Sequence, residues 1–594
     1  MNLENAMSVV LGFSCTSHDS SATLFVDGKL VAAIAEERLT RIKCTGKDIP
    51  RLAIDEVLRH GGVTRADVTH IGVLSGYYPE EYFGWISPRR EIFRKLKRLS
   101  RRLRGKPTEI VWTAHNEREA LAAGGNLETR MRKELFLARE GFRPGTTVSL
   151  HPHHGVHALL AGFYSGFDEC LVITADGFGD LDEAHTSGIY RNGKIEHICG
   201  TNGIGYSAGT FYMTITELLG FRPLRHEGKV LGLAAFGDPA PLHAAFSKAL
   251  RLSDDRMSFL SDFSHPDTAQ EDRAAFLRKA IVGHSRENVA AAAQQVLEES
   301  YIGHVRELLK RTGIRRIAMN GGVAANVKLN QRVAQIPDVE AIFVFPGMSD
   351  SGNSVGAALF AQEHDTPGFL AAHQHALRDV YWGPEYADVD IQRELEAHQL
   401  RHEKLDQAAL VDRAARAMHQ GLVVGWFQGR MEFGPRALGN RSMVSHPTDA
   451  AINKSLNDRL ERTEFMPFAP SVLAERADEI FIGVDKAAHP AEFMTVTFDV
   501  REEWKSRIPA VVHVDGTARP QLVRADRNPL YHALIKRYGE LSGIPLVLNT
   551  SFNVHEEPIV CAPAEGIRAL REDRIDALAI GSFWVDNPLR QSIR

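Results

Sequence analysis

The chain has little cysteine and no long apolar run. Its five cysteines are scattered over 594 residues without CxxC spacing, which argues against a disulfide framework and against a zinc knuckle. No apolar stretch approaches the roughly 20 residues that a bilayer span needs. The start MNLENAMSVV is polar and does not resemble an export signal. We therefore expect reduced cysteines, a cytoplasmic protein and no membrane partner.

A large excess of one charge is also missing. The formal net charge is −5, which gives no general attraction to nucleic acid, so we do not expect a nucleic-acid partner. Residues 87–107, SPRREIFRKLKRLSRRLRGKP, are locally basic, and a solvated helix or loop is the simplest interpretation. The length and the 44% hydrophobic content exceed what one core usually supports, so we expect at least two domains.

A repeat within the first 200 residues is the main sign of organisation. Residues 8–37 read as strand, polar loop, strand, Asp27-Gly28 turn and strand. Residues 170–200 repeat this order around Asn192-Gly193. Two such units, each followed by helical sequence, predict two ribonuclease-H-like lobes that face each other across a cleft. In the actin and sugar-kinase superfamily that cleft holds a nucleotide. The alternative is two unrelated hairpins that look alike by chance.

Two later segments favour a phosphate-binding cleft. A buried strand leads into Gly321-Gly322 and then into helical sequence, an order in which backbone N–H groups can face an anion. A second strand leads to Asp350 and a stretch of small residues that begins another helix. Either segment alone is a weak signal, but together with the repeat they favour a nucleotide over a simple loop.

Four histidines lie between residues 151 and 157. On a helix His153 and His157 share one face, whereas His154 points elsewhere and His151 precedes the helix. Asp176 and Asp350 follow the two strands that would face the cleft, so they are natural further ligands. Imidazole with carboxylate suits iron, manganese or zinc in an open site that faces phosphate. The alternative is a pair of histidines on an ordinary helix surface.

The chain resembles the O-carbamoyltransferases of the NodU/CmcH family. The matching stretches span almost the whole chain in family order, and those of the second half are highly specific. The segment from about 76 to 145 matches least. The stretches are HDSSATLFVDGKLVAAIAEERLTRIK, HHGVHALLAGFYSGF, VITADGFGD, EGKVLGLAAFG, MNGGVAANVKLN, GMSDSGNSVGAAL, VVGWFQGRMEFGPRALGNRS, FMPFAPSVL, PAVVHVDGTARPQLV and PLVLNTSFNVHEEPIV.

The resemblance implies an α/β architecture with two domains. An actin-like (ASKHA, duplicated ribonuclease-H-like) domain would span residues 1–365, and an α+β YrdC-like domain would span residues 387–594 after a linker at 366–386. Carbamoyl phosphate and ATP would form carbamoyladenylate in the second domain. The first domain would then transfer the carbamoyl group to a hydroxyl-bearing small-molecule acceptor. Fe(II), or another divalent transition metal, would be held by His153, His157, Asp176 and Asp350 and would contact phosphate.

Residue roles follow from the same resemblance. His18 would be the base that takes the acceptor's hydroxyl proton, since an ordinary histidine pKa suits that task. Arg519 and His513 would act on carbamoyl phosphate, because guanidinium forks match phosphate oxygens. Asn549 and Ser551 would donate hydrogen bonds to a small polar group. The expected cofactor- and substrate-binding residues are Gly321, Gly322, Asn326, Lys229, Arg430, Arg436, Arg441, Asn549 and Ser551.

One departure from the family pattern concerns the second domain. Glu461 and Thr463 occupy places where many relatives carry a lysine and an arginine, and Arg459 or Arg462 are the available substitutes. Two other functions remain open at this point: a tRNA threonylcarbamoyl-type modification enzyme, and an actin-like small-molecule kinase. The sequence does not identify the acceptor, and it leaves a homodimer open.

Overall fold

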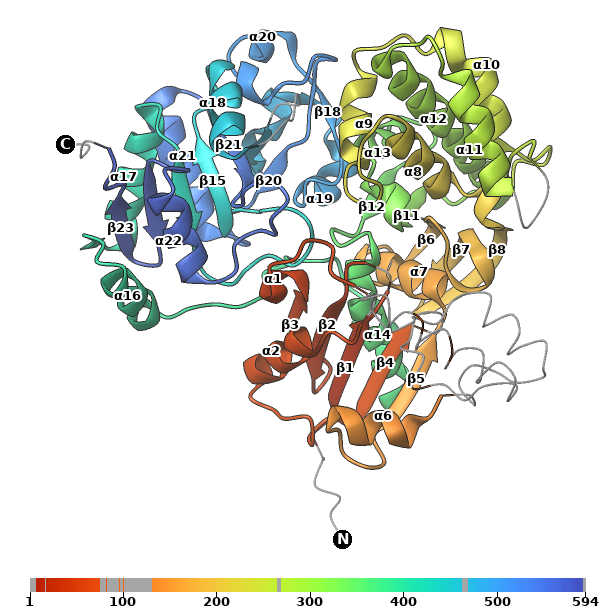
Figure 1. The fold of residues 1–594 in the computed structure, drawn as a ribbon, viewed down its shortest axis with the longest axis horizontal. Coiled ribbons are helices and arrows are strands. Elements are labelled where there is room, and N and C mark those ends of the chain that lie inside the picture. The colour runs from red at the N-terminus through yellow and green to blue at the C-terminus, as the bar shows by residue number, and fades with distance from the viewer. Residues whose placement is uncertain are drawn as a thin grey trace.

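The computed structural model describes residues 7–16, 18–46, 48–74, 82, 96, 100, 131–263, 269–461 and 468–590. These residues form two lobes from the first part of the chain and a third body from the last part (Figure 1). The basic segment 87–107 lies outside the described residues, apart from Leu96 and Ser100, as do Arg462 and Thr463. No helix among the described residues is long and apolar enough to cross a membrane.

The first lobe is built on a five-stranded sheet. Strands β1, β2 and β3 are antiparallel, and Asp27 and Gly28 turn between β2 and β3 with positive φ angles of 47° and 74°. Helices α1, α2 and α6 also belong to this lobe (Glu37–Thr40, Arg51–Gly61 and Lys133–Glu140). The strand order is β3 (Lys29–Ala35), β2 (Ser21–Val26), β1 (Val9–Ser14), β4 (His70–Leu74) and β5 (Thr147–His151).

The second lobe repeats this sheet. Asn192 and Gly193 again form the turn, with φ angles of 51° and 75°. The strand order is β12 (Ala341–Val344), β11 (Arg316–Asn320), β6 (Glu169–Ala175), β7 (Glu183–Arg191) and β8 (Lys194–Asn202). In both lobes the first strand pairs with its hairpin on one side and with a parallel strand on the other. The predicted duplication of a ribonuclease-H-like unit is therefore confirmed.

Further elements surround the second sheet, and several pack on one another in the yellow and green part of Figure 1. The helices are α8 (Ala208–Leu218), α9 (Glu227–Ala234), α10 (Ala240–Ala249), α11 (Ala269–Ala280), α12 (Arg286–Thr312) and α13 (Val327–Ala334). A short antiparallel pair, β9 (Arg251–Leu252) and β10 (Phe259–Leu260), lies among them in the sequence. The buried side chains of α8, α9, α10 and α12 join those of β6 and β11 in one core.

Two helices exchange between the lobes and carry the future site. Helix α7 (His153–Tyr164) follows the last strand of the first sheet but packs on the second sheet, whereas α14 (Asn353–Asp365) follows β12 but packs on the first. Gly12 of β1 and Gly72 of β4 are paired in register beneath α14. A Cβ added at Gly12 would lie 2.1 Å from Ser354 O, and one at Gly72 would lie 2.1 Å from Ala357 O. These two glycines allow α14 to lie directly on the sheet.

The C-terminal domain holds a mixed eight-stranded sheet. Its order is β13 (Glu403–Lys404), β23 (Phe583–Asp586), β22 (Ala577–Ile580), β14 (Val424–Phe427), β15 (Arg441–Ser445), β21 (Leu546–Ser551), β16 (Ala469–Leu473) and β20 (Gln521–Val523). A second sheet contains β17 (Phe481–Ile482), β18 (Phe498–Val500) and β19 (Thr517–Ala518). The helices are α16 (Asp388–Ala397), α17 (Gln407–His419), α18 (Ala451–Arg459), α19 (Ala488–Ala491), α20 (Glu502–Lys505), α21 (Pro529–Ser542) and α22 (Pro563–Arg571). This α+β composition agrees with the prediction, whereas its YrdC-like character stays a prediction.

The connection and the interfaces tie the three bodies together. Helix α15 (Phe369–His373) lies inside the predicted linker, and residues 374–387 have no helix or strand. Across the interfaces, Arg38 donates to Gly434 O at 2.8 Å, and Lys328 Nζ lies 2.8 Å from Asp515. Both lobes therefore contact the C-terminal domain directly.

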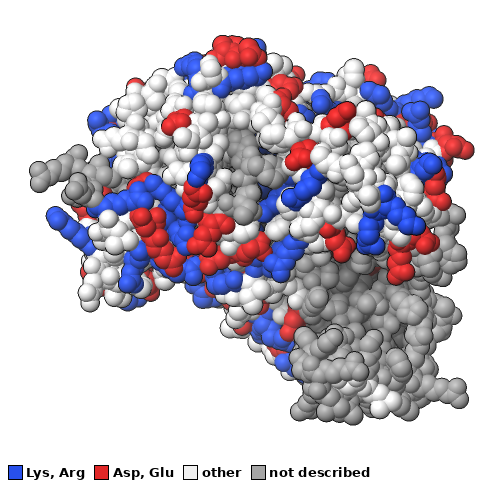
Figure 2. Space-filling view, turned by 45° about the horizontal axis from the view of Figure 1, so that its top comes forward, with Lys and Arg blue, Asp and Glu red and all other residues white. Residues whose placement is uncertain are grey.

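The described surface of the C-terminal domain carries charges of both signs. Arg416 and Arg537 both bind Asp412, each at 2.7 Å. On the face shown in Figure 2, basic and acidic side chains are interleaved over this domain, in the left half of the view. Such a mixed surface does not present one broad basic area of the kind that nucleic acid requires.

Candidate metal centre and anion site

Four side chains from three segments of the sequence meet between the lobes and form a quartet: His153, His157, Asp176 and Asp350. His153 and His157 lie on the first two turns of α7, Asp176 follows β6, and Asp350 lies just before α14. One ligand atom of each lies within 4.8 Å of all the others. The helical spacing brings the two imidazoles together, and the exchange of α7 and α14 between the lobes brings them to the carboxylates. The predicted constellation is therefore present in the structure.

The distances in this quartet suit one shared cation. His157 Nε2 lies 3.3 Å from Asp176 Oδ2 and 3.6 Å from Asp350 Oδ1, and His153 Nε2 lies 3.5 Å from Asp350 Oδ1. Ligand bonds of about 2.0–2.2 Å place neighbouring donors on one ion roughly 3 to 3.5 Å apart. Asp176 Oδ2 is buried and has no well-aligned hydrogen-bond donor among the described residues. The donor set and this buried oxygen fit a divalent transition metal.

Electrostatics couple the imidazoles to the carboxylates. Burial opposes the charged form of His153, but Asp350 and Asp176 outweigh it and raise its pKa to about 9. Burial also opposes ionisation of Asp176, yet His153 and His157 hold the pKa of that carboxyl well below its usual range. His154 differs: burial lowers its pKa to about 3, and its Nδ1 lies 2.6 Å from Thr174 Oγ1. His154 thus points away from the quartet, as predicted.

His18 lies at the edge of the quartet. Its Nδ1 lies 3.1 Å from Asp19 Oδ2, and its Nε2 lies 3.7 Å from Asp350 Oδ2. Burial disfavours the charged imidazole, but Asp19, Asp350 and Asp176 raise the pKa of His18 to about 10. The expectation of an ordinary histidine pKa is therefore wrong for the protein without a cation, because three carboxylates surround the ring.

A second feature lies in the C-terminal domain, at Arg436 and Arg519. Burial lowers the pKa of Arg519, and the nearby charge of Arg436 lowers it further. Both side chains are half-buried, and their Nε atoms are buried without a hydrogen-bond acceptor in the described part of the chain. Among the described residues neither guanidinium has an acidic partner. Two adjacent cations with buried Nε atoms and no acidic partner among the described residues favour an anion that offsets their repulsion and desolvation.

Two family models match the chain and show the family to which it belongs. The family model described as "Carbamoyltransferase N-terminus" matches residues 9–359, and "Carbamoyltransferase C-terminus" matches residues 415–587. The chain belongs to the carbamoyltransferase family. In this carbamoyltransferase the first match covers the two lobes and the second covers most of the C-terminal domain, while the predicted domain bounds stay predictions.

Relatives agree with this assignment. The chain is 34% identical over 581 residues to nodulation protein NolNO of Sinorhizobium fredii, covering 96% of this chain and 79% of that protein. It is 31% identical over 365 residues to 3'-hydroxymethylcephem-O-carbamoyltransferase of Streptomyces clavuligerus, covering 61% of this chain and 65% of that protein. Among solved structures, the Acidaminococcus fermentans (R)-2-hydroxyglutaryl-CoA dehydratase component A shares 16% identity with a TM-score of 0.31, covering 60% of this chain and 98% of that one.

The glycine turn of the carbamoyltransferase lies against the quartet. Gly321 has a φ of 92°, and a Cβ at Gly322 would lie 2.9 Å from Asp176 Oδ1. Asn326, predicted to bind nucleotide, caps α13 by accepting from Leu329 N at 3.0 Å. Lys229 is buried in α9. The glycines therefore border the candidate metal centre, and the nucleotide contacts predicted for all four residues stay predictions.

Several residues that position the quartet were not predicted. Ser207 Oγ donates to Asp176 O at 2.7 Å, and the buried Arg273 donates to Ser207 O at 3.2 Å. Asn353 Nδ2 donates to Asp350 Oδ1 at 3.2 Å, and the His153 amide donates to Asp180 Oδ2 at 2.8 Å. The spacing of three residues between Asp350 and Asn353 is a local signal, whereas nothing in the sequence connects Arg273 with Asp176.

Asn549 belongs to the surroundings of Arg436 and Arg519. Its Nδ2 donates to Ala437 O at 3.1 Å and to Ser471 Oγ at 2.9 Å, while its Oδ1 is buried without a donor. We expected Asn549 to donate to the ligand. The structure instead leaves its oxygen available as an acceptor, because neighbouring protein oxygens already occupy the amide nitrogen.

The remaining predicted residues of the C-terminal domain differ in their contacts. His513 Nδ1 lies 3.2 Å from Asp515 Oδ1, and its Nε2 is buried without a partner. Ser551 Oγ donates to Asn553 Oδ1 at 2.5 Å. Arg430 donates to Val31 O at 2.8 Å, and Arg441 donates to Gln428 O at 2.7 Å.

These contacts separate the predicted arginines into two groups. The guanidiniums of Arg430 and Arg441 bind backbone carbonyls, so they hold the domain interface and the β14–β15 region. Those of Arg436 and Arg519 have no such partners among the described residues. Arg459, considered as a substitute cation, pairs with the buried Asp576 at 3.0 Å, and Glu461 pairs with Arg574. The phosphate contacts predicted for Arg430 and Arg441 stay predictions.

Another cluster of possible metal ligands combines His226, His555 and Glu556. Glu556 Oε2 is held by Arg222 at 2.9 Å and by Arg225 at 3.0 Å, and Oε1 lies 2.9 Å from His226 Nε2. Two arginines beside the carboxylate disfavour a cation there. We therefore interpret this cluster as an ion-pair network between the second lobe and the C-terminal domain of the carbamoyltransferase.

Proposed function

We propose that the protein is an ATP-dependent O-carbamoyltransferase that works in two stages. In the C-terminal domain, carbamoyl phosphate, ATP and water yield carbamoyladenylate, pyrophosphate and phosphate. In the N-terminal domain, the carbamoyl carbon then forms a bond to an acceptor hydroxyl oxygen and AMP leaves. A carbamoyl group is a poor electrophile because its nitrogen donates into the carbonyl, so a nucleotide leaving group is what makes the transfer feasible.

The half-buried pair Arg436 and Arg519 is the observation that carries this proposal. A phosphate group would supply the negative charge that these guanidiniums lack among the described residues. The buried Asn549 Oδ1 could accept a hydrogen bond from a carbamoyl N–H nearby, since Asn549 contacts Ala437, the residue next to Arg436. Carbamoyl phosphate has both groups, a phosphate and an amide nitrogen.

The metal centre supports the location of the transfer stage. His153, His157, Asp176 and Asp350 would hold Fe(II) or another divalent transition metal, with ATP-derived phosphate nearby. Such an ion supplies charge stabilisation to phosphate oxygens. Helices α7 and α14 both begin at this centre, so their N-terminal dipoles also favour an anion.

His18 is the proposed base for the acceptor hydroxyl. Asp19 orients its Nδ1, which leaves Nε2 on the side of Asp350. The carboxylates that keep the ring protonated in the protein alone are the same ones that would bind the cation. A divalent cation would offset their charge and so return His18 toward its neutral, basic form.

The acceptor is proposed to be a natural product or a sugar. A relative is named for O-carbamoylation of a 3'-hydroxymethylcephem and others are named as nodulation proteins, so antibiotic and nodulation-factor acceptors are both candidates for this chain. A tRNA-modifying enzyme would need a surface for RNA, and the basic segment 87–107 is its local candidate. A small-molecule kinase would leave the C-terminal domain without a role.

The decisive test is the Arg519→Ala substitution. Removal of one guanidinium fork should abolish carbamoyl-phosphate-dependent release of pyrophosphate from ATP, while the N-terminal domain still binds ATP. Arg476→Ala is a matched control, because Arg476 is an exposed arginine of the same domain that pairs with Glu479. Pyrophosphate release equal to that of the unmodified protein would exclude Arg519 from the activation site.

A further inference from the structure

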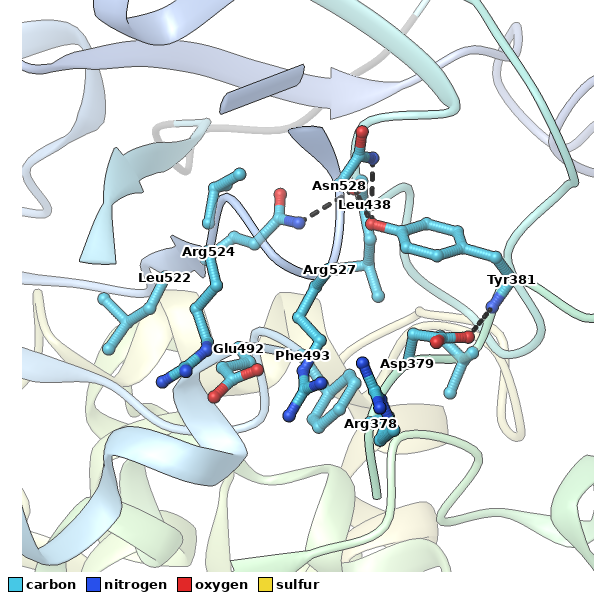
Figure 3. A pocket seen from close by; sticks show the side chains of 13 residues that line it. Arg378, Asp379, Tyr381, Leu438, Glu492, Phe493, Leu522, Arg524, Arg527 and Asn528 are labelled. Atoms are coloured by element: carbon cyan, nitrogen blue, oxygen red, sulfur yellow. Dashed lines mark hydrogen bonds between the residues drawn. The ribbon is translucent and has the colours of Figure 1, made fainter. Parts of the chain in front are cut away.

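A second basic pocket lies beside the connection between the domains. It is lined by Arg378 and Tyr381 of the connection, by Glu492, and by Arg524, Arg527 and Asn528, which precede α21. Its volume is ≈ 300 Å³, including space open to solvent. Neither Arg436 nor Arg519 lines it. Figure 3 shows the ends of Arg378, Arg524 and Arg527 directed toward one region, with Glu492 beside Arg524.

Each of the three arginines has N–H donors without an acceptor among the described residues. Arg378 has no hydrogen bond or ion pair with any of the described residues. Arg524 Nε lies 3.1 Å from Asp526 Oδ1, and Arg527 Nη1 lies 3.2 Å from Asp526 Oδ2. Arg527 Nε is buried without an acceptor. Asp526 therefore binds only some of the N–H groups of Arg524 and Arg527. Arg378 has no counter-ion in the described part of the chain.

The pocket is built on a rigid frame. Asn528 caps α21 by accepting from Tyr531 N at 3.1 Å, and its Nδ2 donates to Tyr381 Oη at 3.0 Å. Tyr381 Oη donates in turn to Leu438 O at 2.9 Å. These bonds hold the connection against the C-terminal domain. They also place the N-terminus of α21, a helix of 14 residues, at the wall of the pocket, where its dipole favours an anion.

Two acidic groups line the same pocket. Asp379 Oδ1 accepts from Tyr381 N at 3.1 Å, so it belongs to the turn of the connection. Burial raises the pKa of Glu492 to about 7, although Arg524 and Arg527 oppose this rise. Near neutral pH a large share of Glu492 is thus uncharged and can donate a hydrogen bond. The balance of charge then favours an anion.

We propose that this pocket binds the phosphate group of a small anion, either free phosphate or a phosphate monoester. Three guanidinium groups from two separate segments match the several oxygens of phosphate better than the two of a carboxylate. Arg378 belongs to the connection, whereas Arg524 and Arg527 belong to the C-terminal domain. A bound phosphate would therefore join the connection to that domain, next to the junction with the second lobe.

Calorimetric titration of full-length Arg519→Ala protein tests this inference, because that background removes the proposed activation site. Inorganic phosphate is titrated in one arm and AMP in the other, and the ligand that depends on Arg378 identifies the source of the phosphate group. Adding Arg378→Ala or Arg527→Ala should weaken that ligand at least about tenfold, the loss expected for a charged hydrogen bond. Arg476→Ala in the same background should leave the affinity unchanged.

Arg378→Ala keeps the test valid if Arg527→Ala fails to fold, since Arg378 is exposed and makes no polar contact with the described residues. Unchanged phosphate and AMP affinities in the Arg378→Ala protein would overturn the proposal. The result is independent of the activation site, because pyrophosphate release depends on Arg519 and phosphate binding here depends on Arg378.

The pH dependence of binding offers a second test. As pH rises above about 7, Glu492 ionises and repels the anion, so affinity should fall relative to that of Glu492→Gln protein. Asp379, Asp526 and the three arginines are the other charged groups at the pocket, and His489 lies near Arg524 and Arg527. The ionisation of phosphate itself is common to both proteins and cancels in the comparison. An identical pH profile in the two proteins would contradict a phosphate beside Glu492.

Discussion

His18 shows how much the role of one residue depends on its surroundings. In sequence it is a histidine of a polar loop, and in the structure it lies between Asp19 and Asp350. These carboxylates raise its pKa to about 10 against the effect of burial, so without a cation the ring is an acid rather than a base at neutral pH. The proposed metal and the proposed base are therefore linked: loss of the metal should also silence His18.

Replacement of His18 by asparagine should separate the two stages of the reaction. Carbamoyladenylate should still form, because activation takes place in the other domain. Carbamoylated acceptor should appear about 100-fold to 10,000-fold more slowly, the usual contribution of a general base. Chromatography of one reaction mixture measures both species, and a more acidic hydroxyl acceptor should reduce the deficit. Simultaneous loss of carbamoyladenylate would instead assign His18 to nucleotide binding or folding.

At the scale of elements, helices α7 and α14 determine where the four candidate metal ligands meet. Each leaves one sheet and packs on the other, so the start of α7 brings His153 and His157 to Asp176, and the start of α14 brings Asp350. The paired glycines Gly12 and Gly72 permit this approach because any side chain there would meet the backbone of α14. The candidate metal centre is thus a product of how two helices pack.

The two histidines that α7 directs to the carboxylates lead to a prediction about metal content. Protein prepared without oxygen and without chelator should contain about one iron-like ion per chain, since two imidazoles and two carboxylates leave positions open for phosphate oxygens. His157→Ala should empty the site. His154→Gln is the matched control, because His154 is equally buried on the same helix but contacts Thr174 instead of the carboxylates. Elemental analysis that finds the same metal content in the His157→Ala and unmodified proteins would exclude this site.

At the scale of the whole molecule, Glu556 connects the C-terminal domain with the second lobe. Arg222, Arg225 and His226, all from one short segment, hold its two oxygens. Burial opposes ionisation of Glu556, but His226 and Arg225 lower its pKa to about 2. Because the folded pKa is below the unfolded value of about 4.3, this contact stabilises the protein above pH 4.3 and is lost as pH falls toward 2.

Melting temperatures of Glu556→Gln and unmodified protein should follow this dependence. The variant should melt at a lower temperature near pH 6, and the difference should shrink as pH falls from about 4.5 toward 2, where Glu556 itself becomes protonated. Glu403→Gln is the control, since Glu403 forms an exposed ion pair within one domain. A difference between Glu556→Gln and unmodified protein that stays constant over this range would show that the charge of Glu556 does not hold the domains together.

Much of the fold and of the candidate metal centre follows from the sequence alone. The turns at Asp27-Gly28 and Asn192-Gly193 require positive φ angles, which the residue types at these two adjacent positions favour. Both hairpins were therefore predicted correctly. The spacing of His153 and His157 depends only on helical periodicity. Asp176 and Asp350 were proposed from their positions after two strands that would face the cleft, and the family motifs supported them. The turns and the histidine spacing are local in the chain, so residue order is sufficient to reveal them.

Only the tertiary structure decided which polar groups are available to a ligand. Arg430, Arg436, Arg441 and Arg519 look alike in sequence, but the fold surrounds two of them with backbone carbonyls and leaves the other two without an acidic partner among the described residues. For the same reason Asn549 Oδ1 has no donor among the described residues, and Arg378 lines one pocket with Arg524 and Arg527. Pairing of a polar group depends on segments far away in the chain, and residue order does not specify which segments those are.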